Sequence, residues 1–296
     1  MNQPLPPGVI ALDALLPLDM ARKAEEIGVA KARMSRTATL ALALLAGAFI
    51  ALGANFSTMA TTSATGQLPY GMTRLLAGTT FSLGLILVVV GGAELFTGNN
   101  LIVMAWASRK VTSLEVLRNW SLVYAGNFAG AVLMAGLILL TRQHEMAEGR
   151  LGLNALTIAE SKCRLDPVQA VALGVACNVL VCLAVWLCYS ARSVTDKVLA
   201  IVPPITAFVV AGFEHSVANM YFIPLGLGIK HLAGQRFWQA TGRSAADYPD
   251  LTWPRFLLNN LLPVTLGNMI GGAVLVGLVY WSIYLRPPHR DAGQRP

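Results

Sequence analysis

Six long apolar stretches dominate this chain and constrain its fold more than any other feature. They cover residues 38–61, 75–107, 114–140, 168–189, 198–228 and 257–285. Each reaches the roughly twenty residues that a helix needs to cross the hydrocarbon core of a bilayer. Only 12% of the residues are charged, whereas soluble domains carry about a quarter. The sequence therefore predicts an all-α integral membrane protein with six transmembrane helices.

The second and fifth stretches are too long for one straight span, and polar residues interrupt both. The interruptions cover residues 94–100 and 214–219. Backbone that leaves the helical conformation at membrane depth must be buried in protein or line a watery cavity. We therefore expect two broken helices.

An internal repeat relates the two halves of the chain. The pattern G-x-E-x4-N occurs at residues 92–99 and at 212–219, and G-N-x-x-G occurs at 126–130 and at 267–271. Asn55 and Asn178 are expected to be equivalent in the first and fourth spans. Because each repeat holds three spans, the halves must insert in opposite orientations, which predicts an inverted-topology repeat with a substrate site where the broken helices meet.

Four polar residues of the repeated motif are predicted to stabilise the breaks rather than to touch a substrate: Glu94, Asn99, Glu214 and Asn219. A carboxylate in lipid is costly, so both glutamates should face inward. There they can accept hydrogen bonds from the backbone amides that the breaks leave free.

The charged residues predict the orientation. If both termini are cytoplasmic, the segments on that side hold 13 of the 22 lysines and arginines, as the positive-inside rule favours. Residues 12–34 form an amphipathic pattern that predicts a helix on the cytoplasmic face. The chain thus divides into an N-terminal helix, 1–36, and a channel domain with a short polar tail, 37–296. No basic cluster is interleaved with aromatic residues, so nucleic acid is not an expected partner.

One histidine of four, His215, lies within an apolar stretch. At a helix break it can attract a small anion, donate a hydrogen bond or pass a proton. Thr97 offers a hydroxyl at the other break. A single membrane histidine cannot supply bis-histidine haem ligation, and the four cysteines show no metal-binding spacing. No metal or cofactor is expected.

Several segments resemble the formate/nitrite transporter family over residues 35–285. They are ELFTGNN at 94–100, YAGNF at 124–128 and GFEHSVANM at 212–220, with Trp106 and Arg109-Lys110 after the first. The resemblance implies an aquaporin-like fold and a homopentamer in the bacterial cytoplasmic (inner) membrane. It also implies a pore in each protomer for formate, nitrite or a related small anion.

The family match also assigns site residues. The implied substrate-binding residues are Thr97, His215, Asn178, Asn268 and Lys162, with Lys162 in the outer vestibule. The implied pore constrictions are Phe81, Leu85 and Phe208 on the cytoplasmic side and Leu95, Phe96 and Val181 on the periplasmic side.

These features predict pH-dependent, proton-coupled passage of formate, with small anions and membrane lipids as partners. The residues leave open whether His215 donates a proton or acts as a fixed cation, and whether the N-terminal helix gates the pore. Nitrite is the main alternative substrate, followed by hydrosulfide and lactate. Two other classes are a membrane-anchor subunit of a redox enzyme and a pore for neutral solutes, but the chain lacks haem-ligand pairs and Asn-Pro-Ala breaks.

Overall fold

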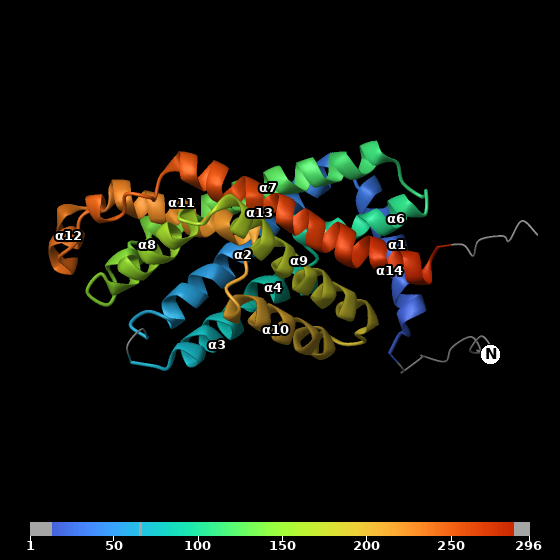
Figure 1. The fold of residues 1–296 in the computed structure, drawn as a ribbon, viewed down its shortest axis with the longest axis horizontal. Coiled ribbons are helices and arrows are strands. Elements are labelled where there is room, and N and C mark those ends of the chain that lie inside the picture. The colour runs from blue at the N-terminus through green and yellow to red at the C-terminus, as the bar shows by residue number, and fades with distance from the viewer. Residues whose placement is uncertain (1–13, 65–66, 287–296) are drawn as a thin grey trace, which may run out of the picture.

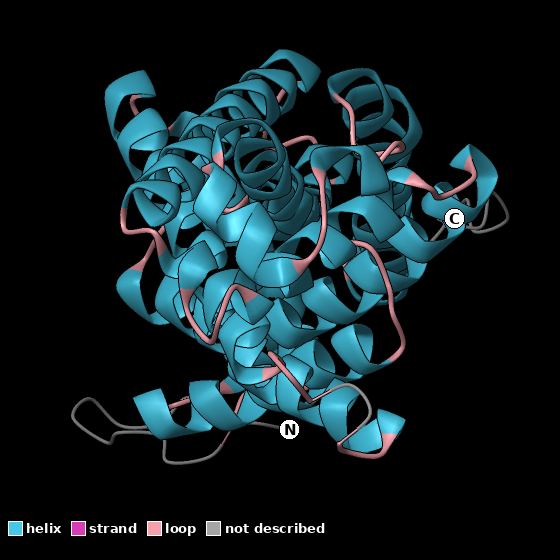
Figure 2. Ribbon diagram, turned by 90° about the vertical axis from the view of Figure 1, so that its left-hand side faces the viewer, coloured by secondary structure: helices cyan, strands magenta, loops and turns pink. Residues whose placement is uncertain are grey.

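A computed structural model describes residues 14–64 and 67–286, and the regular elements in those ranges are helices (Figures 1 and 2). The α-helices of the first half are α1 (Pro17–Arg33), α2 (Arg36–Ala60), α3 (Tyr70–Phe81), α4 (Leu83–Gly91), α5 (Phe96–Asn99), α6 (Val103–Ala107) and α7 (Ser113–Leu140). Those of the second half are α8 (Arg150–Cys163), α9 (Pro167–Ser190), α10 (Val194–Val210), α11 (Ser216–Leu232), α12 (Gln235–Thr241), α13 (Leu262–Met269) and α14 (Val279–Tyr284). Short 3₁₀ turns are η1 (Asn100–Ile102), η2 (Gln143–Glu145) and η3 (Ala245–Asp247), and π-helical stretches are η4 (Arg255–Leu261) and η5 (Ile270–Leu278).

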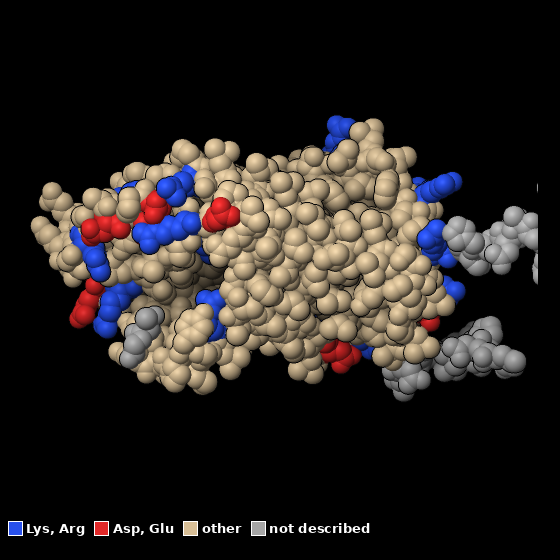
Figure 3. Space-filling view, viewed as in Figure 1, with Lys and Arg blue, Asp and Glu red and all other residues tan. Residues whose placement is uncertain are grey.

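Five helical segments are long and apolar enough to cross a membrane, counting the described residues only. They are Arg36–Ala60, Tyr70–Gly91, Ser113–Leu140, Pro167–Ser190 and Arg255–Tyr284. The expected fifth span is divided between α10 and α11, each of 17 residues. On the face drawn in Figure 3, most charged side chains gather at the two ends of the molecule and leave an uncharged band between them. The predicted all-α membrane fold is confirmed, with five candidate spans among the described residues and one further apolar stretch divided between α10 and α11.

Both expected breaks are present. Helix α4 ends at Gly91 and α5 begins at Phe96, while α10 ends at Val210 and α11 begins at Ser216. Gly92 and Gly212 leave their helices with φ of 77° and 73°, a conformation that glycine adopts without steric cost. The first break begins before residue 94, and Phe96–Asn99 is already helical. Broken helices are confirmed, although residues 96–99 belong to α5 and residues 216–219 to α11, the helices that follow the two breaks.

Close packing of glycines joins the long helices in two equivalent pairs. A Cβ atom on Gly47 of α2 would overlap the backbone carbonyl of Asn127 in α7, and one on Gly130 of α7 would overlap that of Leu44. In the other half, a Cβ on Gly267 or Gly271 would overlap carbonyls of α9. Small residues let membrane helices approach until their backbones touch.

Helix α1 begins five residues later than the predicted 12–34 helix and ends at Arg33. Residues 1–13 and the polar tail 287–296 lie outside the described residues. The small and apolar face of α1, which includes Ala21 and Ala24, is buried against η1, α6, α9 and α14. Helices α1 and α14 lie at the same end of the molecule (Figure 1), which agrees with the predicted even number of membrane crossings.

Candidate functional site

The two breaks meet at a contact between Thr97 and His215. The Thr97 hydroxyl lies 2.9 Å from Nε2 of His215, and both side chains are buried. Each residue lies at the start of the helix that follows its break. The predicted pairing of these two positions is therefore realised in space, 118 residues apart along the chain.

The hydrogen bonds of His215 define which ring nitrogen carries the proton. Its Nδ1 accepts the backbone N–H of Ala218 at 3.1 Å and so caps α11. A nitrogen that accepts a hydrogen bond has a free lone pair, so the proton of the neutral imidazole lies on Nε2. Nε2 then donates to Thr97, and the Thr97 hydroxyl hydrogen is left available to an anion.

Glu94 lies in the first break and holds a buried ion pair. Its Oε1 accepts from Nζ of Lys31 at 2.6 Å, and its Oε2 accepts from Nδ2 of Asn99 at 2.7 Å. Asn119 closes the cluster, because it accepts from Asn99 and donates to the carbonyl of Lys31. The lysine comes from α1, so the N-terminal helix is joined directly to the break.

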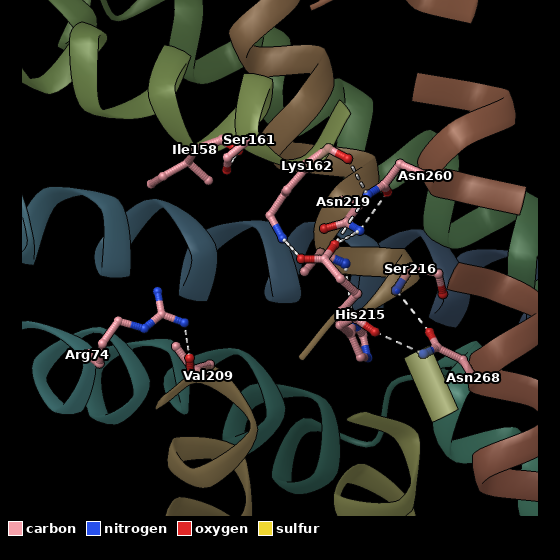
Figure 4. Close-up of polar contacts among 12 residues, drawn as sticks. Arg74, Ile158, Ser161, Lys162, Val209, His215, Ser216, Asn219, Asn260 and Asn268 are labelled. Atoms are coloured by element: carbon pink, nitrogen blue, oxygen red, sulfur yellow. Dashed lines mark hydrogen bonds and ion pairs between the residues drawn. The ribbon is translucent and has the colours of Figure 1, made fainter. Parts of the chain in front are cut away.

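Glu214 has equivalent partners in the second break, and Figure 4 labels three of them, Lys162, Asn219 and Asn260. Its Oε1 accepts from Nζ of Lys162 at 2.7 Å, and its Oε2 accepts from Nδ2 of Asn219 at 2.6 Å. Asn260 accepts from Asn219 and donates to the carbonyl of Lys162. Four residues of matching type thus make the same four contacts in both breaks.

The backbone of each break is held by an asparagine, not by the glutamates. Asn127 accepts the N–H of Phe96 and donates to the carbonyl of Glu94. Asn268 accepts the N–H of Ser216 and donates to the carbonyl of Glu214. The expectation that the glutamate carboxylates accept the freed amides is therefore wrong, because a buried lysine and an asparagine already occupy their oxygens.

These contacts confirm the inverted repeat but correct one equivalence. Glu94 N–H donates to the carbonyl of Leu42, and Glu214 N–H donates to that of Leu173, so the first spans are related by 131 residues. The same interval relates Lys31 to Lys162, a pair outside the repeated motifs because Lys31 precedes the first apolar stretch. Asn55 and Asn178 are not equivalent.

Asn55 and Asn178 also have different surroundings. Asn55 bonds to Gln143 and Tyr221. Asn178 donates to the carbonyls of Thr97 and Asn268 and to Asn100, at the junction of the breaks.

Two cavities approach the Thr97–His215 contact from opposite ends. The α8 cavity, of about 790 Å³, is lined by Arg74, Phe81, Lys162, Phe208, Glu214 and His215 among others. The α1 cavity, of about 550 Å³, is lined by Lys23, Lys31, Leu85, Glu94, Leu95 and Lys197 among others. His215 lines the α8 cavity, and Gly98, next to Thr97, lines the α1 cavity, so the buried contact lies between the two.

The predicted grouping of the constriction residues is wrong, because Leu85, expected on the same side as Phe81 and Phe208, lines the other cavity. Phe81 and Phe208 line the α8 cavity, where their rings meet edge to face with centroids 5.6 Å apart. Leu95 lies on the α1 side with Leu85. Whether a residue precedes or follows a break does not determine which cavity it lines. Helix α3 begins at the α8 end of the molecule, whereas α10 begins at the α1 end (Figure 1).

Four further predicted residues line neither cavity. The Asn268 side chain is engaged with backbone of α9 and of the second break, and Asn178 has a buried Oδ1 without a partner among the described residues. Phe96 packs on Tyr124 of α7, with ring centroids 4.9 Å apart, and Val181 lies in the core. Arg74, which sequence reasoning did not single out, does line the α8 cavity.

No group of three or more metal-ligating side chains occurs in the described ranges. The four cysteines are free and buried.

Comparison with known proteins identifies the family. A family model described as "Formate/nitrite transporter" matches residues 18–282. The chain is 48% identical to formate channel FocA of Escherichia coli K12 over 274 residues, which is 93% of this chain and 96% of that protein. It is 40% identical to formate channel FocA of Haemophilus influenzae, over 93% of this chain and 96% of that one.

A solved structure titled "Pentameric formate channel with formate bound" superposes with a TM-score of 0.81 at 49% identity. It covers 85% of this chain and 98% of that one. The chain therefore belongs to the formate/nitrite transporter family, whose members are channels and transporters rather than enzymes.

Proposed function

We propose that this protein carries formate across a bacterial cytoplasmic membrane, through a pore in each protomer of a homopentamer. The observation that carries the proposal is the buried Thr97–His215 contact between two cavities. The proposal is also supported by sequence similarity, because nearly half of the aligned residues are identical to those of proteins named formate channels.

Electrostatics explains why such a contact suits a small anion. A bare anion loses its hydration on leaving a cavity, and its transfer into a low-dielectric passage has a large free-energy cost. The Thr97 hydroxyl can donate to a carboxylate oxygen, since its own acceptor site is filled by Nε2–H of His215. The rings of Phe81 and Phe208 narrow the approach and exclude larger solutes.

The tautomer of His215 supplies the link to pH. Loss of a proton from neutral imidazole would leave an imidazolate, so His215 can protonate formate only after it has itself gained a proton at Nδ1. That proton displaces the Ala218 N–H from Nδ1. We infer that formate passage accelerates as the pH falls and His215 becomes able to deliver a proton through Thr97.

The remaining predicted residues fall into two roles. The Glu94–Asn99 and Glu214–Asn219 clusters stabilise the breaks, and Asn178 and Asn268 hold the backbone that presents Thr97 and His215. The end that holds α1 and α14 faces the cytoplasm, and the α8 cavity opens to the periplasm.

The test is uptake of radiolabelled formate into proteoliposomes between about pH 5 and pH 8, the range over which imidazole changes charge. Wild type is compared with His215→Asn and Thr97→Val. We expect saturable wild-type flux that rises toward low pH, about tenfold lower flux in each variant, and no pH dependence in His215→Asn. Equal flux in wild type and His215→Asn at every pH would contradict the proposal.

Nitrite is the second candidate, because it is also a planar monovalent anion with two oxygens and the matching family model names both ions. Nitrite as a competitor in the same assay separates the two. Rapid nitrite flux without formate flux would replace the substrate and leave the fold and the pore unchanged.

A further inference from the structure

The C-terminal end of α10 opens toward the α8 cavity. Helix α10 stops at Val210, next to the second break. The last carbonyls of a helix lack intrahelical donors and form the negative end of its dipole. An anion that approaches His215 through this cavity passes beside that negative end, because Val209, Gly212 and His215 all line it.

Arg74 of α3 covers these carbonyls (Figure 4). Its Nη2 donates to the carbonyl of Val209, and its Nε donates to that of Val210 at 3.4 Å. The guanidinium therefore places a full positive charge against the negative helix end. Arg74 is half-buried, so the cavity still reaches it.

The charged residues that line the α8 cavity are Arg74, Lys162 and Glu214, and His215 lines it as well. Lys162 is paired with Glu214 at 2.7 Å, and its ammonium also lies over the ring of Phe222. His215 is neutral in the hydrogen-bonded arrangement seen here. The net positive charge of the cavity lining is therefore that of Arg74.

The guanidinium also keeps donors for a ligand. Arginine carries five N–H groups in a planar fork that fits a carboxylate in a bidentate manner. The carbonyls of Val209 and Val210 occupy the Nη2 and Nε sides, and Nη1 has no partner among the described residues.

We propose that Arg74 is the docking site for a small carboxylate in the α8 cavity, and that it, rather than Lys162, supplies the charge that draws the anion in. This inference rests on the proposed formate transport and adds a binding step before the Thr97–His215 contact. Arg74 has two tasks at once: it neutralises the carbonyl end of α10, and it offers its free N–H groups to the arriving anion.

The test measures the half-saturating formate concentration for uptake into host cells that lack other formate channels, so that formate enters from the α8 end. Arg74→Gln removes the charge, and Arg74→Lys keeps it. Arg243→Gln is the matched control, since Arg243 is an exposed arginine near α12 that does not line the α8 cavity. Pentamer assembly is checked by size-exclusion chromatography.

We expect Arg74→Gln to raise the half-saturating concentration about five- to tenfold at low ionic strength, with maximal flux within about twofold of wild type. The difference should shrink in high salt, which screens partly exposed charges. Arg74→Lys should stay within about threefold of wild type, and Arg243→Gln should match it. An unchanged half-saturating concentration in Arg74→Gln would overturn the inference.

A second variant tests the inference if Arg74→Gln does not assemble into a pentamer. Thr73→Glu places a carboxylate beside Arg74 in the same cavity lining and leaves the caps on Val209 and Val210 in place. It should raise the half-saturating concentration to a similar degree, and no rise would overturn the inference. If wild type takes up no formate at all, the proposed function fails instead, so the two failures are distinguishable.

Discussion

At the scale of single residues, the two buried lysine–glutamate pairs are the contacts most sensitive to substitution. The side chains of Lys162 and Glu214 are 15% and 7% exposed, and those of Lys31 and Glu94 are 26% and 4% exposed. A buried pair gains little net stability over an apolar pair, but removal of one partner leaves an uncompensated charge.

Lys162→Ala is therefore expected to destabilise the folded protein by about 3–5 kcal/mol. The double variant Lys162→Ala/Glu214→Gln should recover most of that loss, because it removes the orphaned carboxylate. Thermal unfolding in detergent measures both. Equal loss in the single and the double variant would show that lost packing, rather than an unpaired charge, is the cause.

His144 provides a pH prediction at the same scale. It is buried beside Phe237, and its Nδ1 has no partner among the described residues. Burial lowers the pKa of His144 against the opposing effect of Glu145. The unfolded chain then binds a proton more readily than the folded one, so stability is full above the unfolded pKa of about 6.5 and falls as the pH drops below it.

We expect the unfolding temperature to decrease between about pH 7.5 and pH 5.5, and to decrease less in His144→Gln, which cannot be protonated. Differential scanning fluorimetry of the two proteins across this range is the measurement. The same slope in both proteins would assign the pH dependence to other groups.

At the scale of elements, the paired glycines hold α2 against α7 and α9 against the last span. Leucine at Gly47 or Gly271 would collide with backbone, which cannot yield as a side chain does. We expect Gly47→Leu and Gly271→Leu to cost about 3 kcal/mol each, the upper end of the usual range for overpacking, and to reduce recovery of folded protein from membranes.

Gly136 is the matched control, because a Cβ atom there meets nothing within 4 Å. Gly136→Ala should be recovered like wild type. Normal recovery of Gly47→Leu would mean that α2 and α7 can separate without loss of the fold.

At the scale of the whole molecule, the proposed topology places both termini in the cytoplasm. Helices α1 and α14 meet at one end (Figure 1), and residues on this side include Lys23, Lys31, Arg33 and Lys110. A C-terminal green fluorescent protein fusion should fluoresce, whereas a C-terminal alkaline phosphatase fusion should be inactive. An active phosphatase fusion would invert the topology.

The assembly state is a second prediction at this scale. Native mass spectrometry of the detergent-solubilised protein should give five copies of the 31.5 kDa chain. A monomer that still transports formate would separate the pore from the pentamer, and a different closed ring would correct the assembly.

Much of this architecture was predictable from composition and repeated motifs. Apolar blocks predict helices because a bilayer leaves backbone groups no other partner, and the repeated G-x-E-x4-N located both breaks. The same motifs located Thr97 and His215, since polar residues at membrane depth are costly and therefore concentrate where they function.

The sequence did not predict how deep in the membrane a side chain lies or which residues it contacts. Lys31, Asn119 and Arg74 lie in unremarkable surroundings in the sequence, and their partners Glu94, Asn99 and Val209 come from other helices. Whether Phe81 or Leu95 faces the α1 or the α8 cavity depends on where each half-helix starts and how far it reaches. Local hydropathy determines that a segment enters the membrane, so the sequence by itself determined the spans. Side-chain contacts, depths and the charge balance of each cavity depend on how distant segments pack, because they are set by distances in space and not along the chain.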